Sequence, residues 1–450
     1  MSGTDASGAD GGGARSRGTE IGATAYVAPY AHLPGGLARD VLVEVAAGRI
    51  TAVTPGATPP PGAVRLDGVV LPGLANAHSH AFHRALRGRT AHVGGDFWSW
   101  RTAMYAVAAD LDPDRYLRLA TAVYAEMALA GITCVGEFHY LHDDPDGRPY
   151  GAPGAMGDAL VEAARRVGIR ITLLDTLYLT AGVDGAPLTG VQRRFRGGGL
   201  DGWRQRAAAP APAHARRAAA VHSVRAVPAA LLPEVAAAVP GGPLHVHLSE
   251  QPAENEACLA AHGRTPAALL DAHGLLGPDT TAVHATHLTP ADVALLGASR
   301  TGVCLCPTTE RELADGIGPG RALADAGATL SLGSDSHTVL DLFAEARGVE
   351  EHERLATGRR GHFDPAALLA AATAGHAACG WPDAGAIAAG RRADLVAVRL
   401  DSPRTAGVDP AAILAAATAA DVTATVCDGR LLDRAGLSAA LAAQWTGGTA

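Results

Sequence analysis

The sequence predicts an α/β fold: a (β/α)8 TIM-like barrel joined to a small composite β-sandwich domain that both ends of the chain build. Three observations lead to this prediction. Eight short apolar runs alternate with Ala/Leu-rich helical stretches, which calls for a parallel sheet, and eight strands close a barrel. Strand-like segments with turn residues flank this middle region on both sides. Titratable residues follow six of the eight apolar runs, where a barrel places its catalytic groups.

The apolar runs have the length and composition of buried strands. Helical stretches such as 116–130 and 291–296 separate them, and Thr289-Pro290 is a helix-start signal for the second of these. Residues 185–216 interrupt the alternation with glycines and prolines, which predicts a long loop or lid. An open doubly wound sheet stays an alternative. The runs lie at about 69–77, 131–138, 169–177, 217–224, 243–248, 281–286, 301–306 and 329–333.

Both ends of the chain are rich in short strand patterns. Residues 41–45 and 49–53 flank a glycine and form a β-hairpin pattern, and residues 393–398 and 423–427 again resemble short strands. One small sheet assembled from both termini accounts for these segments. The predicted organisation is a disordered tail over 1–20, the small β domain over 21–68 and 385–435, the barrel over 69–384, and a C-terminal tail over 436–450.

The bulk composition excludes several classes of protein. Of the 450 residues, 48% are hydrophobic and 18% charged, which excludes global disorder. The net charge of −8 offers no field for nucleic acid, and no apolar stretch reaches the roughly 18 residues of a membrane span. The Gly/Ala/Ser/Asp-rich start lacks the apolar centre of a signal peptide, so we expect a cytoplasmic protein. The six scattered cysteines do not form a disulfide framework, and Cys304 and Cys306 are either core residues or a soft-metal pair.

His78-Ser79-His80, at the end of the first apolar run, is the most informative motif. Two imidazoles at i and i+2 of an extended chain point to the same side and can bind one divalent metal. His247 and Asp335 end two other runs and would add a third imidazole and a carboxylate. Zinc prefers this type of ligand set and lowers the pKa of a bound water.

Three residues near these ligands are candidates for the chemistry. Glu250 lies three residues after His247 and could move a proton from the attacking water to a leaving amine. His284 could orient the hydroxide or stabilise the transition state, and Asp335 could assist in generating the hydroxide. Each has an ordinary structural alternative, such as a packed histidine or a helix N-cap at Asp335. Their joint position at predicted strand ends favours a site, with His245, His287 and His337 as supporting residues.

These motifs resemble those of the amidohydrolase superfamily over roughly residues 21–435. The resemblance rests on the segments 72–80, 247–250 and 333–337, on His284, and on the return to the small β domain at 385–395. No lysine follows the fourth run in a position to bridge two metals, so the resemblance is to the mononuclear branch. It implies one Zn²⁺ per subunit, held by the ligands proposed above.

Within that branch the chain resembles the formimidoylglutamate deiminases. The resemblance implies hydrolysis of N-formimino-L-glutamate to N-formyl-L-glutamate and ammonia in histidine degradation, with contacts to the substrate from Arg101, Tyr140, His222 and Arg225. Each arginine could bind one carboxylate of this dicarboxylate in bidentate fashion. His83 stands where the family often has Gln and is a further candidate contact. The supporting motifs lie at 97–101, 136–142, 192–195, 222–225, 283–287 and 308–316.

We therefore expect a small-molecule substrate, no nucleic-acid or membrane partner, and a homodimer. Two other functions remain open. One is an aminohydrolase that acts on a heteroaromatic amine such as guanine or a pterin, which needs no pair of cationic groups. The other is a metal-binding scaffold without catalysis, against which the two candidate acids Glu250 and Asp335 argue, because passive packing requires neither.

Overall fold

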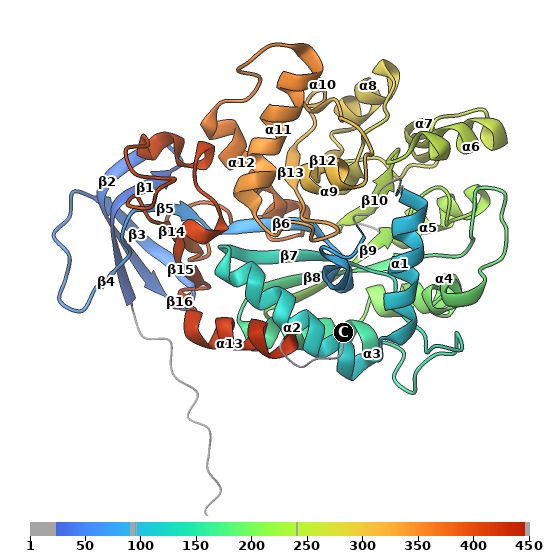
Figure 1. Ribbon diagram of the computed structural model, residues 1–450, viewed down its shortest axis with the longest axis horizontal. Coiled ribbons are helices and arrows are strands. Elements are labelled where there is room, and N and C mark those ends of the chain that lie inside the picture. The colour runs from blue at the N-terminus through green and yellow to red at the C-terminus, as the bar shows by residue number, and fades with distance from the viewer. Residues whose placement is uncertain (1–23, 91–94, 96, 240–241, 446–450) are drawn as a thin grey trace, which may run out of the picture.

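The structure is a computed structural model that describes residues 24–90, 95, 97–239 and 242–445. The predicted N-terminal tail over 1–20 lies outside the described residues. Two separate sheets organise the chain (Figure 1). One belongs to a helix-covered barrel, and the other combines strands from the two ends of the chain, drawn in blue and red at one side of the barrel (Figure 1).

The barrel sheet has eight parallel strands in sequential order, so neighbouring strands in the chain are neighbours in space. Each of the eight predicted apolar runs overlaps one of these strands, which confirms the predicted barrel and removes the alternative of an open doubly wound sheet. The strands are buried on both faces, as parallel strands covered by helices are. They are β6 (Leu74–Ser79), β7 (Ile132–His139), β8 (Arg170–Leu177), β9 (Ala215–Val221), β10 (Leu244–Leu248), β11 (Thr280–His284), β12 (Gly302–Leu305) and β13 (Leu330–Leu332).

The barrel closes between its last and first strands at the carboxyl end of β13. Ser79 and Asp335 form a parallel bridge, and the Asp335 N–H donates to the His78 carbonyl at 3.0 Å. A side chain at Gly333 would place its Cβ 2.7 Å from the Cβ of His78, so only glycine permits this close approach. Closure of the barrel therefore brings the His-x-His motif beside Asp335.

The second sheet also has eight strands, in the order β16-β15-β14-β5-β1-β2-β3, with β4 paired to β1. The predicted hairpin over 41–53 is confirmed as the antiparallel pair of β2 and β3. The strands are β1 (Thr24–Leu33), β2 (Gly36–Ala46), β3 (Arg49–Pro55), β4 (Val64–Arg65), β5 (Val69–Pro72), β14 (Leu395–Val398), β15 (Val422–Cys427) and β16 (Arg430–Leu431).

The first predicted run, 69–77, divides between the two sheets. Its first half is β5, which pairs with β1 and β14 in the small sheet, and its second half begins β6 of the barrel. The Gly73 N–H donates to the Asp394 carbonyl at 2.9 Å at the point of division. Both halves are buried and apolar, so hydrophobicity alone does not reveal the boundary between them.

Helices surround the barrel and link its strands (Figure 1). The start signal at Thr289 is confirmed, since its side chain and that of Asp292 form a capping box at the start of α8. The helices are α1 (Phe97–Asp110), α2 (Pro113–Leu129), α3 (Ala155–Val167), α4 (Gly199–Ala207), α5 (Leu232–Ala238), α6 (Pro252–His262), α7 (Pro266–Ala272), α8 (Pro290–Ser299), α9 (Pro307–Glu312), α10 (Gly320–Ala326), α11 (Leu342–Thr357), α12 (Pro365–Ala378) and α13 (Arg434–Trp445), with short 3₁₀ turns η1 (Ala81–Leu86), η2 (Gly190–Phe195), η3 (Ala229–Leu231), η4 (Pro410–Ala415) and η5 (Ala419–Asp421).

Two segments differ from the prediction. The expected loop over 185–216 contains η2, α4 and the start of β9, because its glycines form turns around a short helix instead of one long loop. The expected C-terminal tail forms α13 over Arg434–Trp445, which packs against α2 (Figure 1). The Arg434 side chain donates to the Leu129 carbonyl at 3.1 Å, at the end of α2.

The cysteines are core residues. All six are free and buried, and Cys134, Cys304, Cys306 and Cys379 share one apolar cluster inside the barrel. Among the described residues, no group of three or more potential metal ligands includes a cysteine. In the described part of the chain, no helix combines the length and the apolar character that a membrane crossing requires.

Candidate active site

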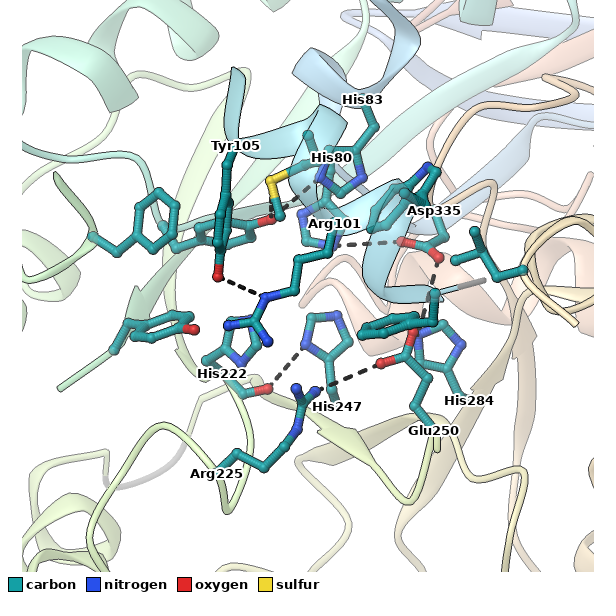
Figure 2. Close-up of a pocket in the computed structure, with 17 residues that line it drawn as sticks. His80, His83, Arg101, Tyr105, His222, Arg225, His247, Glu250, His284 and Asp335 are labelled. Atoms are coloured by element: carbon teal, nitrogen blue, oxygen red, sulfur yellow. Dashed lines mark hydrogen bonds and ion pairs between the residues drawn. The ribbon is translucent and has the colours of Figure 1, made fainter. Parts of the chain in front are cut away.

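Four histidines and one aspartate converge at the carboxyl end of the barrel. The Nε2 atom of His78 lies 3.2 Å from the Nε2 atom of His247 and 3.3 Å from an oxygen of Asp335. The Nε2 atom of His80 lies 3.5 Å from the same oxygen. His284 extends the cluster from the neighbouring strand β11, with its Nε2 atom 4.0 Å from the other oxygen of Asp335 (Figure 2). The predicted metal ligands therefore lie together.

The separations between these atoms fit one metal ion. Two ligands about 2.1 Å from a tetrahedral zinc lie about 3.4 Å apart, and three separations, from His78 to His247 and from Asp335 to His78 and His80, are 3.2–3.5 Å. Two overlapping groups of residues could each hold an ion: His78, His80 and Asp335, and His78, His247 and His284. The Nδ1–H of His80 donates to the Phe138 carbonyl at 2.8 Å, and that of His247 donates to the His222 carbonyl at 2.9 Å. Because a carbonyl only accepts, the Nε2 atom of each ring faces the cluster without a proton, as a metal ligand requires.

Charge at the cluster also suits a cation. Burial and the neighbouring His78 lower the pKa of His80 to about 3, and burial lowers the pKa values of His78 and His247. These imidazoles are therefore neutral at pH 7. Burial alone would raise the pKa of Asp335, but its histidine neighbours hold that pKa below its usual range, so the carboxylate is ionised. The residue set fits a divalent metal.

Backbone strain concentrates at the same edge. Five residues other than glycine have positive φ angles there, and the φ of His284 is +70°. Such conformations cost about 1–3 kcal/mol each and persist where the surrounding structure enforces them. The strained residues follow or end β10, β11 and β13, and they are Ser249, His284, Ala285, Asp335 and His337.

Glu137 on β7 fixes the backbone around the His-x-His motif through two hydrogen bonds. One of its oxygens accepts from the Ser79 hydroxyl at 2.6 Å, and the other accepts from the Ala81 N–H at 2.6 Å. Burial raises the pKa of Glu137 to about 8. His337, predicted as a supporting residue, lies 3.0 Å from the Ser79 hydroxyl through its Nε2 atom. Glu137 lies in the segment 136–142 that carried the family resemblance, but the sequence does not indicate this contact.

Glu250 and His284 form the acid–base part of the cluster. The Nε2 atom of His284 lies 3.7 Å from Glu250, and its Nδ1 atom lies 3.7 Å from Glu310. Burial raises the pKa of Glu250. Burial lowers the pKa of His284, but Glu250, Glu310 and Asp335 outweigh that effect and raise the pKa to about 10. His284 is thus an imidazolium among carboxylates before any metal binds.

A pocket opens above the cluster, and all five predicted substrate contacts line it: His83, Arg101, Tyr140, His222 and Arg225. Arg101 and Arg225 approach it from opposite sides (Figure 2). The Nε atom of Arg101 donates to the Tyr105 hydroxyl at 2.6 Å, and the Nε atom of Arg225 donates to Glu254 at 2.7 Å. The rest of the wall is apolar and aromatic, and includes Phe97, Trp100, Met104, Tyr178, Phe195 and Leu313.

Several polar residues near the pocket were not assigned a role from the sequence. Gln192 donates to the Tyr105 hydroxyl at 3.2 Å, so Tyr105 receives hydrogen bonds from both Gln192 and Arg101. Asp315, whose pKa burial raises to about 9, accepts a hydrogen bond from Gln251. Gln192 and Asp315 do belong to the motifs that carried the family resemblance, but the spacing of those motifs does not identify their partners.

The two other predicted supporting histidines lie away from the cluster. The Nε2 atom of His245 lies 2.9 Å from the Ala378 carbonyl, and that of His287 lies 2.7 Å from the Asp315 carbonyl. Each ring therefore bonds to backbone instead of to a predicted metal ligand.

The chain belongs to the amidohydrolase family, whose pattern matches residues 69–432. It is 39% identical over 397 residues to the formimidoylglutamate deiminase of Pseudomonas aeruginosa, covering 84% of this chain and 87% of that protein. It is also 31% identical over 408 residues to a 5-methylthioadenosine/S-adenosylhomocysteine deaminase of Haloarcula marismortui, covering 88% of each. The family resemblance seen in the sequence is confirmed.

Solved structures agree with this assignment. A Brucella melitensis amidohydrolase matches with a TM-score of 0.84 and 29% identity, over 94% of this chain and 99% of that one. A Xanthomonas campestris adenosine deaminase with bound zinc matches with a TM-score of 0.77 and 26% identity, over 94% and 98%. The chain is accordingly an enzyme that hydrolyses carbon–nitrogen bonds.

Proposed function

We propose that the enzyme hydrolyses N-formimino-L-glutamate to N-formyl-L-glutamate and ammonia, in the degradation of histidine. The observation that carries this proposal is the pair Arg101 and Arg225, which point into one pocket directly above the histidine cluster (Figure 2). A substrate with two carboxylates and one amidine matches two guanidinium groups and one hydrolytic centre. The identity to the Pseudomonas aeruginosa deiminase supports the same substrate.

The proposal includes one zinc ion per subunit, held by His78, His80, His247 and Asp335, and a homodimer. A zinc ion supplies an activated water at neutral pH, since it lowers the pKa of bound water towards about 7. The hydrogen bonds from His80 to Phe138 and from His247 to His222 hold both rings with their Nε2 atoms toward the metal. Light scattering and metal analysis of the purified protein test the subunit number and the zinc stoichiometry.

Glu250 is the group that moves protons. Its buried carboxyl has a raised pKa, so it can accept the proton of the attacking water and donate it to the amidine nitrogen. It can then carry the hydroxyl proton of the tetrahedral intermediate to the same nitrogen, which leaves as ammonia while the carbonyl of the formyl group forms. His284, held positive by the surrounding carboxylates, lies beside Glu250 and stabilises the negative charge that develops on the tetrahedral intermediate.

The pocket binds the remainder of the substrate. Each guanidinium binds one carboxylate through its terminal nitrogens, because its Nε atom is already engaged by Tyr105 or Glu254. Tyr140 and His222 pack against each other with ring centres 5.4 Å apart and form the wall between the two arginines. His83 bonds to the Tyr140 hydroxyl at 3.2 Å, so this histidine acts on the substrate through the position of Tyr140.

The test is ammonia release by protein of known zinc content, on N-formimino-L-glutamate beside N-formimino-L-aspartate, guanine and cytosine. In the same assay we expect Arg101→Met and Arg225→Met each to raise KM by roughly 10-fold to 100-fold, the loss of one charge-assisted contact. Arg115→Met, at an exposed arginine of α2, is the matched control. Wild-type KM values in both pocket variants would contradict the binding of a dicarboxylate.

A heteroaromatic amine is the second candidate substrate. The aromatic residues of the pocket wall offer faces for a flat ring, and two of the relatives described above are deaminases of adenine-containing compounds. Turnover of guanine in preference to N-formimino-L-glutamate, unaffected by loss of either arginine, would favour this alternative.

A further inference from the structure

Glu254, in the first turn of α6, is a buried carboxylate that touches two parts of the site at once. Only 1% of its surface is exposed. One carboxylate oxygen accepts from the Nε–H of Arg225 at 2.7 Å, and the other accepts from the backbone N–H of Ser249 at 3.1 Å. Arg225 contributes a substrate contact of the proposed function, and Ser249 directly precedes Glu250 in the chain.

We propose that Glu254 is a positioning residue that keeps Arg225 and Glu250, which stand 3.7 Å apart as an ion pair, from closing into a direct hydrogen-bonded pair. It holds Arg225 in the orientation that binds a substrate carboxylate, and it holds the backbone that aims Glu250 at the reacting nitrogen. This inference rests on the proposed function, because it assigns Arg225 to a carboxylate of the substrate.

Arg225 lies between two carboxylates, those of Glu250 and Glu254. Its Nη2 atom lies 3.7 Å from Glu250, outside hydrogen-bond distance (Figure 2), whereas its Nε atom bonds to Glu254. A guanidinium binds a carboxylate best through two parallel hydrogen bonds. Without the anion at position 254, Glu250 is the carboxylate closest to Arg225 within the described part of the chain, and the pair would close. Closure would occupy both the binding group and the proton carrier.

Glu254 also holds the backbone at Ser249, directly before Glu250. Ser249 has a φ of +50°, a left-handed backbone conformation that residues other than glycine rarely adopt. The hydrogen bond from its N–H to Glu254 satisfies that donor at the corner between His247 and Glu250. One carboxylate thus enforces the strained corner and orients the arginine facing it.

The same helix provides a matched control. Glu256 lies two residues further along α6 and is exposed, while Glu254 is buried. Glu254→Gln and Glu256→Gln therefore make the same chemical change on one helix, and only the first removes the anion beside Arg225.

The first experiment measures binding and turnover in the zinc-loaded enzyme. We expect Glu254→Gln to weaken binding of glutarate, an unreactive dicarboxylate, by at least about tenfold in calorimetry and to raise KM for N-formimino-L-glutamate by a similar factor. We also expect kcat to fall at least about tenfold, since Glu250 becomes paired. Glu256→Gln should match the wild type in all three values, and thermal unfolding verifies that both variants fold.

The second experiment separates positioning from general structural support. On N-methylformamidine, an amidine without a carboxylate, Glu254→Gln alone should lose kcat, and the double variant Glu254→Gln/Arg225→Met should recover it at least about tenfold, since no arginine remains to pair with Glu250. A merely structural role predicts that the second substitution brings no recovery.

The outcomes separate the two proposals. Absence of ammonia release by the wild-type enzyme on N-formimino-L-glutamate would contradict the proposed function. Wild-type glutarate affinity and kinetics in Glu254→Gln, or no recovery in the double variant, would overturn the positioning role while leaving the proposed function intact.

Discussion

The two ends of the barrel differ in how closely their buried charged groups approach one another. At the carboxyl end, the charged and polar groups stand 3.3–4.0 Å apart, at His78–Asp335, Glu250–His284 and His284–Asp335. At the opposite end, Arg170 donates to Asp394 at 3.0 Å and to Asp428 at 2.8 Å. These three pairs of the histidine cluster stop short of direct contact, although the supporting pair Arg225–Glu254 at the same end bonds at 2.7 Å. The charged groups of the opposite end bond directly.

The paired end joins the barrel to the small sheet. Arg170 begins β8, and Asp394 and Asp428 lie beside β14 and β15. Burial would raise the pKa of Asp394, but Arg170 keeps that pKa below its ordinary value, so both partners stay ionised. Trp381 lies under the Arg170 guanidinium, 5.3 Å from it. The Arg170 guanidinium and the two carboxylates are therefore bonded to one another.

This difference separates the charged groups that stabilise the fold from those that are placed to bind a metal or a substrate. Electrostatic groups that need a metal or substrate must be held near one another by other means, here by strained backbone and by partners such as Glu137 and Glu254. Groups that only support the fold can approach to full contact. Substitutions at the two ends should therefore separate into losses of activity and losses of stability.

The largest expected effect is on activity at the carboxyl end. We expect Glu250→Gln to lower kcat by roughly 10²-fold to 10⁴-fold, the usual contribution of a positioned proton carrier. Zinc content and the midpoint of thermal unfolding should stay close to the wild type, because Glu250 bonds to no predicted metal ligand at hydrogen-bond distance. Ammonia release at the wild-type rate would exclude Glu250 as the proton carrier. The control is Glu234→Gln, at an exposed glutamate of α5.

Substitutions at the opposite end of the barrel should lower the free energy of unfolding more than they lower activity. Arg170→Met leaves Asp394 as an uncompensated buried charge, so we expect the free energy of unfolding in urea to fall by about 3–5 kcal/mol. The kcat of the protein that remains folded should change little, since Arg170 lies at the far end of the barrel strands. Arg399→Met breaks an exposed ion pair with Asp401 and should leave the free energy of unfolding close to that of the wild type. Equal losses of unfolding free energy in Arg170→Met and Arg399→Met would contradict the view that the paired charges at this end of the barrel stabilise the fold.

Patterns local in sequence were predictable, and contacts across the chain were not. The eight barrel strands follow from continuous apolar runs, and the pair His78 and His80 follows from the two-residue period of a strand. Glu254 and Arg225 are separated by 29 residues, and only the close approach of β9 to β10 brings them together. The spacing of charges along the chain does not indicate such a pair.

Errors in the predicted boundaries also have a physical cause. The division at Gly73 is invisible because both flanking strands are buried and apolar. Helix α13 buries only Leu437 fully, so its sequence carries too weak an apolar stripe to distinguish a docked helix from a tail. Hydrophobic pattern identifies elements that bury a face completely and misses those that rest lightly on the surface.

A buried carboxylate near the carboxyl end of β12, outside the pocket lining, sharpens the comparison, because it forms no direct ion pair among the described residues. Glu345 on α11 is fully buried and accepts from the N–H and the hydroxyl of Thr308. Burial raises its pKa from 4.5 to about 8. The folded state therefore keeps a proton that the unfolded state loses above pH 4.5, and the stability contributed by this group is present below pH 4.5 and is lost as pH rises to 8.

Glu345→Gln removes this titration and tests its sign. The free energy of unfolding of the wild type, relative to that of the variant, should fall between pH 5 and 8 by at most about 1.4 kcal/mol per pH unit. Glu351→Gln, at an exposed position of the same helix, should run parallel to the wild type over this range. Parallel profiles for wild type and Glu345→Gln would mean that Glu345 is ionised in the folded state, and that a buried carboxylate here needs only the hydrogen bonds of Thr308 to hold its charge.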